Sequence, residues 1–137
     1  MPSGGGTAVQ VTIKGGHGGF ESADGRFFYY AKGDNVPGVW RLPTTGGEET
    51  EVLPSLEAGY WGYWALVDDG IYYLDTSGPP GVAFYSFATR RTSRVFDLES
   101  RPVLYVTGLG VSPDGKTILY TQLDAFSRDI VLVDNYR

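Results

Sequence analysis

Ser112-Pro113-Asp114-Gly115, followed two residues later by the strand-like run Ile118–Tyr120, is the stretch of this 137-residue sequence that decides the fold. An Asp-Gly pair favours a tight turn, because Asp bonds to its own backbone and Gly accepts a positive φ angle. The pair recurs at Asp24-Gly25 and Asp69-Gly70, so the three pairs stand 45 residues apart. A fixed period of this length indicates a repeat protein built from one supersecondary unit.

Each Asp-Gly pair is followed by an aromatic or β-branched run, and the period continues downstream at Trp40, Tyr85 and Ile130. Phe27–Tyr30 lacks apolar/polar alternation, which is typical of a strand buried on both faces. We expect four short strands in each of the first two units. The expected strands lie at 19–22, 27–30, 39–42 and 50–53, then at 63–67, 71–74, 82–87 and 94–98, and finally at 109–112, 118–120 and 130–133.

The last unit lacks a fourth strand, and the missing piece appears at the start of the sequence. Pro2, Gly5, Gly6 and Val11 match later residues at a constant offset of 41. We therefore divide the chain into a closing strand at 1–13 and three units at 14–53, 54–98 and 99–137. Sharing one unit between the two ends of a ring of sheets removes exposed edges.

The composition agrees with an all-β fold. Hydrophobic residues make up 42% and aromatic residues 15%, and there are 20 Gly and eight Pro, which favours short strands and tight turns over long helices. The sequence has no cysteine, which excludes a disulfide scaffold, a thiolate zinc site and a cysteine nucleophile. A net charge of −5 opposes binding to nucleic acid or to an anionic membrane. We expect no signal peptide and no membrane insertion, and the compartment, periplasmic or cytoplasmic, stays open.

These residues resemble the WD40-like β-propeller repeat of TolB-type bacterial proteins. The family pattern is a Ser-Pro-Asp-Gly turn, an apolar strand, a polar turn and a strand that ends in an apolar residue, Val and Asp. Residues 129–134, which end in Leu-Val-Asp, fit this last part. Residues 21–26 fit with Ala23 in place of Pro, and the second unit keeps only Asp69-Gly70. The resemblance covers nearly the whole chain. It implies a β-propeller with three four-stranded blades, and a chain that is a natural or engineered fragment of a larger envelope or regulatory protein.

Three blades do not close a propeller, which usually has about 4 to 8 blades. The simplest closure is a homodimer with a six-bladed ring, in which Val9–Ile13 of one chain completes the blade at Lys116–Val133 of the other. A nine-bladed trimer is a less favoured alternative.

Propellers of this kind serve as binding platforms, sensor modules and accessory domains of enzymes. We favour a non-enzymatic binding or scaffold module for proteins or small ligands, and the acidic residues lack the spacing of metal ligands, so we expect no cofactor or metal. The candidate ligand-binding residues are His17, in a glycine-rich stretch, and Tyr60, Trp61 and Tyr63, whose rings stack on a ligand if they line a central channel. Packing between blades is the competing explanation for the aromatic residues. The alternative function is a hydrolase or lyase with His17, Glu21 and neighbouring tyrosines in the channel.

Overall fold

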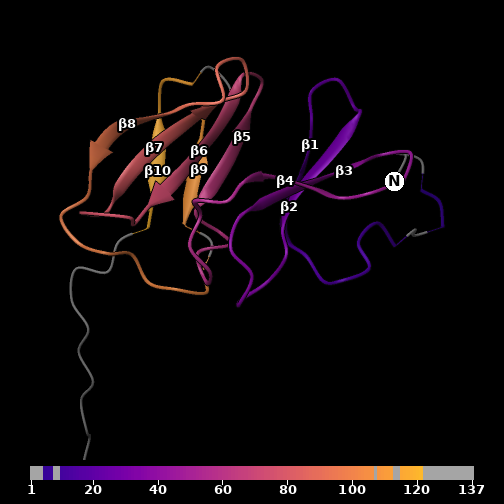
Figure 1. The fold of residues 1–137 in the computed structure, drawn as a ribbon, viewed down its shortest axis with the longest axis horizontal. Helices are drawn as coiled ribbons and strands as arrows, with labels where there is room; N and C mark the ends of the chain where they lie inside the picture. The colour runs from indigo at the N-terminus through magenta and orange to yellow at the C-terminus, as the bar shows by residue number, and fades with distance from the viewer. Residues whose placement is uncertain (1–4, 8–9, 107, 113–114, 122–137) are drawn as a thin grey trace, which may run out of the picture.

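The protein consists of β-strands and their connections over the residues that the structure, a computed structural model, describes: 5–7, 10–106, 108–112 and 115–121 (Figure 1). No helix occurs in these ranges, and so none that could span a membrane. The all-β prediction is confirmed. Ten strands form three separate antiparallel sheets.

The first sheet is a meander in which neighbouring strands of the chain pair in the order β1-β2-β3-β4. Phe28 lies opposite Leu42, and the hairpin between β1 and β2 has an irregular register between His17 and Phe20. The strand bounds are β1 (His17–Glu21), β2 (Phe27–Ala31), β3 (Val39–Pro43) and β4 (Thr50–Leu53).

The second sheet repeats this topology in the order β5-β6-β7-β8, and a third sheet pairs β9 with β10. In both four-stranded sheets the third and fourth strands shift register near the start of the third strand, after Val39 and after Val82. The strands are β5 (Trp64–Val67), β6 (Gly70–Asp75), β7 (Gly81–Ser86), β8 (Thr92–Asp97), β9 (Leu109–Val111) and β10 (Ile118–Tyr120).

All ten strands overlap the ranges expected from the sequence, with ends that differ by at most two residues. The largest differences at a start are in β1, which begins at His17 and not at Gly19, and in β8, which begins at Thr92 and not at Arg94. The expected strand at 130–133 lies outside the described residues, as does Val9. Gln10–Ile13 is described and forms no strand in the single chain. Its pairing with a second chain, the propeller arrangement and the homodimer all stay predictions.

The first and third Asp-Gly turns share one set of hydrogen bonds. The backbone amide of Phe27 donates a hydrogen bond to the Ser22 hydroxyl at 3.0 Å, and the amide of Thr117 donates to the Ser112 hydroxyl at 2.9 Å. In each turn the glycine amide, that of Gly25 or Gly115, donates to the serine carbonyl at 2.8 Å. Both glycines have left-handed φ angles, 68° and 69°, as the turn chemistry predicts.

The second Asp-Gly pair differs from this expectation. Val67 pairs directly with Gly70, so the turn is Asp68-Asp69 and the glycine is already in β6. Its φ is not left-handed. A Cβ at Gly70 would lie 2.2 Å from the Tyr85 carbonyl oxygen, so close packing against β7, and not a positive φ, requires glycine here.

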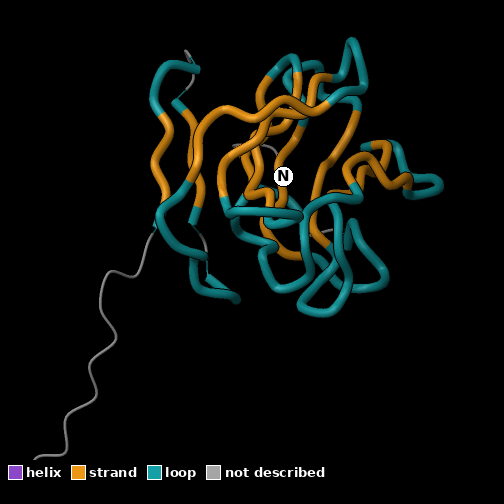
Figure 2. Tube along the Cα trace, turned by 60° about the vertical axis from the view of Figure 1, so that its left-hand side comes forward, coloured by secondary structure: helices purple, strands orange, loops and turns teal. Residues whose placement is uncertain are grey.

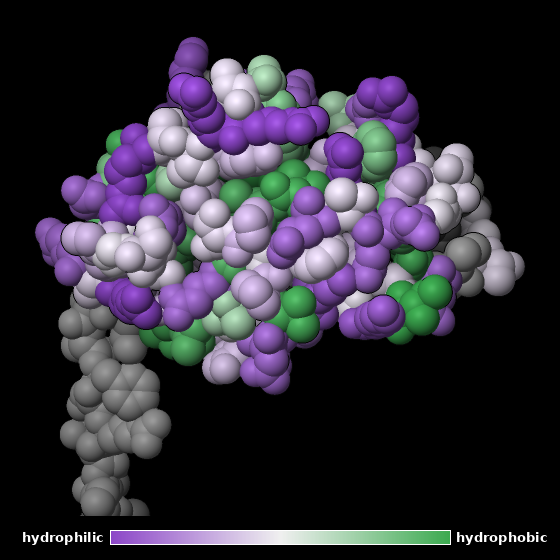
Figure 3. Space-filling view, viewed as in Figure 1, coloured by the Kyte–Doolittle hydropathy of each residue, from purple (hydrophilic) through white to green (hydrophobic). Residues whose placement is uncertain are grey.

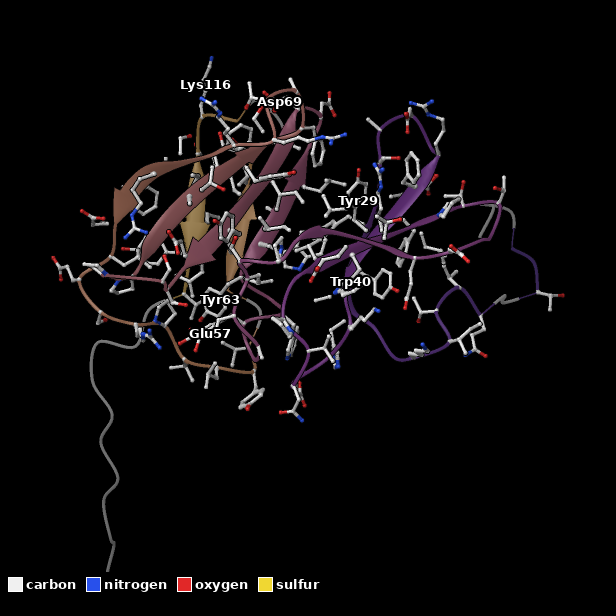
Figure 4. The ribbon with its side chains drawn as sticks, viewed as in Figure 1. Tyr29, Trp40, Glu57, Tyr63, Asp69 and Lys116 are labelled. Atoms are coloured by element: carbon white, nitrogen blue, oxygen red, sulfur yellow. The ribbon has the colours of Figure 1, made fainter. Side chains whose placement is uncertain are left out.

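One hydrophobic core joins the first two sheets. Tyr29 of β2 stacks on Phe87 at 5.8 Å between ring centroids, and Figure 4 labels Tyr29 in the region where the two sheets meet. The central strands are buried over most of their length, as the lack of alternation predicts. The buried members of this core are Tyr29, Val39, Leu53, Leu56, Tyr60, Tyr63, Trp64, Ile71, Tyr73, Leu74, Ala83 and Leu98.

The third sheet lies beside the second, with β9 against β5 and β6. Backbone amides of Gly108 and Leu109 donate to the Gly62 carbonyl at 2.9 and 3.2 Å. The turned view shows the β9–β10 pair standing next to the larger sheet (Figure 2). The second sheet is therefore flanked by the other two.

Candidate functional site

His17 and Trp61, both predicted from the sequence, lie against each other. His17 is the first residue of β1, and Trp61 belongs to the connection between β4 and β5. Their rings stack with centroids 4.7 Å apart and an interplanar angle of 29°. His17 is exposed and Trp61 is half-buried. The buried Trp61 Nε1 has no hydrogen-bond partner within the described residues.

A second aromatic contact holds β1 in place beside this pair. Phe20 packs edge-on against Trp64, with ring centroids 5.0 Å apart. The Trp64 indole Nε1 donates to the Trp61 carbonyl at 2.9 Å, so both tryptophans are fixed in one short segment. The exposed strand β1 is thereby attached to the aromatic core of the second sheet.

Tyr60 and Tyr63 are separated from His17 and lie in the core. They are 3% and 1% exposed, and their rings meet edge-on at 5.7 Å. The hydroxyl of Tyr60 donates to the Pro102 carbonyl and that of Tyr63 to the Thr121 carbonyl, each at 3.3 Å. Burial raises the pKa of both phenols. Neither ring has surface left for a ligand in this chain, which agrees with the packing explanation for these two residues.

His17 also lines a small groove of about 180 Å³, together with residues of β1, of β2 and of the segment before β1. Tyr30, in its wall, donates a short hydrogen bond to Glu49, which also pairs with Lys32 at 2.6 Å. The Lys32 ammonium lies 3.4 Å from the centroid of the Trp40 ring, which Figure 4 labels. Burial and the Glu49 contact raise the pKa of Tyr30, whereas the hydrogen bonds from Lys32 and Tyr30 lower that of Glu49.

The residues of the hydrolase or lyase alternative do not form a catalytic arrangement in the described part of the chain. Glu21 is at the far end of β1 from His17, and its carboxylate lies beside the turn glycine Gly25. The His17 ring has no hydrogen bond or ion pair to a described residue, so no described group activates it as a base. Nor do the described residues contain a group of three His, Asp or Glu side chains that could hold a metal ion.

A larger cleft, which the sequence did not reveal, opens between the first and second sheets. Its volume is about 690 Å³, and both sheets contribute aromatic and charged side chains to it. The space-filling view shows hydrophilic side chains bordering a hydrophobic region between the sheets (Figure 3). The residues that matter for its chemistry are Phe27, Tyr29, Arg41, Tyr85, Phe87 and Arg90.

The first Asp-Gly turn forms part of the rim of this cleft. Asp24 accepts hydrogen bonds from the Ser22 hydroxyl at 2.7 Å and from the Arg26 backbone amide at 3.1 Å, and it pairs with the Arg26 guanidinium at 2.6 Å. These contacts, the Ser22 bond first, lower the pKa of Asp24 to about 2. The Asp24 carboxylate and the Arg26 guanidinium therefore already form an ion pair with each other.

No model of a known protein family matches this sequence, and no curated protein matches it.

Proposed function

We propose that this chain is a non-enzymatic β-propeller binding module that supplies three blades to a six-bladed ring made by two copies. The ring serves as a scaffold for a protein or small-molecule ligand. The observation that carries the proposal is the division of the chain into successive antiparallel meanders, of which the first two share one aromatic core. Packing of consecutive meanders through large aromatic side chains is what the blades of a propeller require.

The segment expected to close the ring supports the involvement of a second copy. Val11 and Ile13 are 47% and 90% exposed, although both are large apolar residues. Gln10–Ile13 forms no strand in the single chain, and among the described residues the Thr12 carbonyl accepts only the Gln10 side-chain amide at 2.9 Å. An exposed segment without strand partners can pair with another chain. Burial of two such side chains in a partner's sheet provides part of the hydrophobic stabilisation of a dimer.

The solution mass tests this closure. We expect sedimentation or light scattering to give twice the 14.9 kDa chain mass at micromolar concentration. Ile13→Lys places a charge in the closing strand, and it should weaken the dimer by about tenfold or more, because a buried unpaired charge is costly. Val36→Lys is the matched control, since Val36 is 40% exposed in the connection between β2 and β3 and takes no part in the predicted closure.

Two outcomes would contradict the proposal. A well-folded wild-type monomer at all accessible concentrations would exclude ring closure by self-association. Equal weakening by the Ile13 and Val36 substitutions would show that the dimer uses another surface.

A further inference from the structure

The cleft between the first and second sheets combines an apolar wall with two unpaired cations. Phe27 and Tyr29 come from β2, whereas Tyr85 and Phe87 come from the end of β7 and the turn after it. Stacked and edge-on contacts hold Phe87 between Tyr29, at 5.8 Å, and Tyr85, at 6.2 Å. This aromatic wall is fixed by packing and does not need a ligand to form.

Arg41 is the first of the two cations. Its guanidinium carbon lies 4.4 Å from the centroid of the Phe27 ring, and the residue is half-buried. Among the described residues, its side chain has neither a hydrogen bond nor a carboxylate oxygen within 4.0 Å. By contrast, Arg26, Arg94 and Arg101 each pair with a carboxylate. A partly desolvated guanidinium without an acceptor gains more from an anion than a hydrated one does.

Arg90 lines the same cleft from the second sheet. It lies in the turn between β7 and β8 with a left-handed φ of 55°, which is unfavourable for a residue with a side chain. A hydrogen bond from its amide to the Ser86 carbonyl at 2.8 Å holds this conformation. Its guanidinium also lacks an ion pair within the described part of the chain.

None of the carboxylates that line the cleft forms an ion pair with Arg41 or Arg90. Asp24 is matched to Arg26, Glu21 lies beside Gly25, and a Glu51 carboxylate oxygen lies 3.0 Å from the position of a Cβ at Gly38. Asp68 belongs to the exposed turn after β5. The lining has four carboxylates and three arginines, so its net charge is not positive. No described carboxylate is within 4.0 Å of the Arg41 or Arg90 guanidinium, however, so an anion would bind at these two groups and not through the net charge of the cleft.

We propose that this cleft binds a carboxylate attached to an apolar or aromatic group. Arg41 takes the carboxylate through its planar, preorganised guanidinium, and Arg90 adds positive charge from the opposite sheet. The half-buried rings of the wall, those of Phe27, Tyr85 and Phe87, pack on the apolar part of the ligand, and the buried Tyr29 supports them from the core. This inference deepens the proposed binding function by naming a ligand class, but it needs only one chain and does not need the ring.

Calorimetry and amide chemical-shift titration with 3-phenylpropionate test the inference. We expect saturable binding, with shifts concentrated in β2, β3 and the turn after β7. The neutral 3-phenylpropanamide should bind at least tenfold more weakly, because it cannot form charge-assisted hydrogen bonds. Arg41→Gln should weaken binding of the acid by about tenfold or more. Arg26→Gln is the control, and its effect should stay below about threefold, because Asp24 already occupies that guanidinium.

A capped Asp-Phe dipeptide distinguishes the two sources of such a carboxylate, an acidic peptide segment and a free small acid. Tighter binding of the dipeptide identifies a peptide ligand, and tighter binding of 3-phenylpropionate identifies a small acid. Failure of both to bind the wild type, equal binding of the amide, or unchanged binding to a folded Arg41→Gln variant would overturn the inference. A dimer that binds neither probe would leave the proposed ring intact, and a monomer that binds them would remove the ring while supporting the cleft.

Discussion

At the scale of single residues, the same Asp-Gly pair serves two different physical purposes. In the first and third turns a serine hydroxyl accepts a backbone amide across the turn, and the glycine adopts a left-handed φ. In the second turn Val67 stands where Ser22 and Ser112 stand, and it has no hydroxyl to accept that amide. The turn there is shorter, and glycine is required at position 70 because β7 leaves no space for a side chain.

Substitution of Gly70 separates these two purposes. Gly70→Ala should lower the free energy of unfolding by about 2 to 3 kcal/mol, because the new methyl group collides with the Tyr85 backbone and the Phe84 ring. Gly110→Ala is the matched control in a strand, since a Cβ at that position meets nothing within 4 Å. We expect its effect to stay within about 0.5 kcal/mol. Urea denaturation measures both changes.

The close-packing explanation fails if both alanine variants unfold at the same urea concentration as the wild type. A loss that is equally large in Gly110→Ala would point to a general intolerance of the strands to alanine.

At the scale of elements, the sequence predicted the strands well because their signals are local. Turn residues and aromatic runs such as Phe27–Tyr30 determine where a strand starts and ends without reference to distant parts of the chain. The burial of individual aromatic residues is not local. Tyr60 and Tyr63 lie in a core shared by two sheets, and their hydroxyl groups donate to carbonyls about 40 to 60 positions later, those of Pro102 and Thr121. The four residues of the predicted site therefore form two separate pairs, His17 with Trp61 at the surface and Tyr60 with Tyr63 in the core.

The cleft was also beyond prediction from the sequence. Arg41 lies in β3 of the first sheet and Arg90 in the turn between β7 and β8 of the second, and neither lies in a recognisable motif. Their lack of a carboxylate partner becomes visible only when the neighbouring side chains are placed. The high aromatic content of the sequence is compatible with a ligand-binding cleft, but it is equally compatible with aromatic side chains that only pack in the core.

The contact between β1 and the β4–β5 connection depends on Trp61. Trp61→Ala should lower the free energy of unfolding by about 2 kcal/mol, because the His17 stack and part of the Trp61 burial are lost. Trp61→Phe keeps an aromatic ring for His17 and removes the unpartnered buried Nε1, so its stability should stay within about 1 kcal/mol of the wild type. Thermal and urea unfolding compare the three proteins.

If Trp61→Ala keeps the stability of the wild type, Trp61 does not serve packing. Loss of a ligand by such a stable variant would then support the binding role that the sequence suggested for this residue.

At the scale of the whole molecule, the 45-residue period anticipated the division into successive sheets, although it could not show how strongly they depend on one another. The answer comes from the shared core, in which Leu53 and Val39 of the first sheet join Ile71 and Tyr73 of the second. A small sheet whose apolar face is covered by its neighbour is only marginally stable when that neighbour is unfolded. We therefore expect the first two sheets to unfold as one cooperative unit.

Native-state hydrogen exchange of a core variant tests this coupling. Leu53 is the last residue of β4 and is buried, so Leu53→Ala should cost about 3 kcal/mol. Because the core is shared, the opening free energies of amides in β6 and β7 should fall by the same amount as those in β2 and β3. Thr50→Ala, on the exposed side of the same strand, should leave both sheets within about 0.5 kcal/mol of the wild type. A loss of protection confined to β2 and β3 would show that each sheet is stable by itself, and a second copy of the chain would then not be needed to complete a ring of interdependent blades.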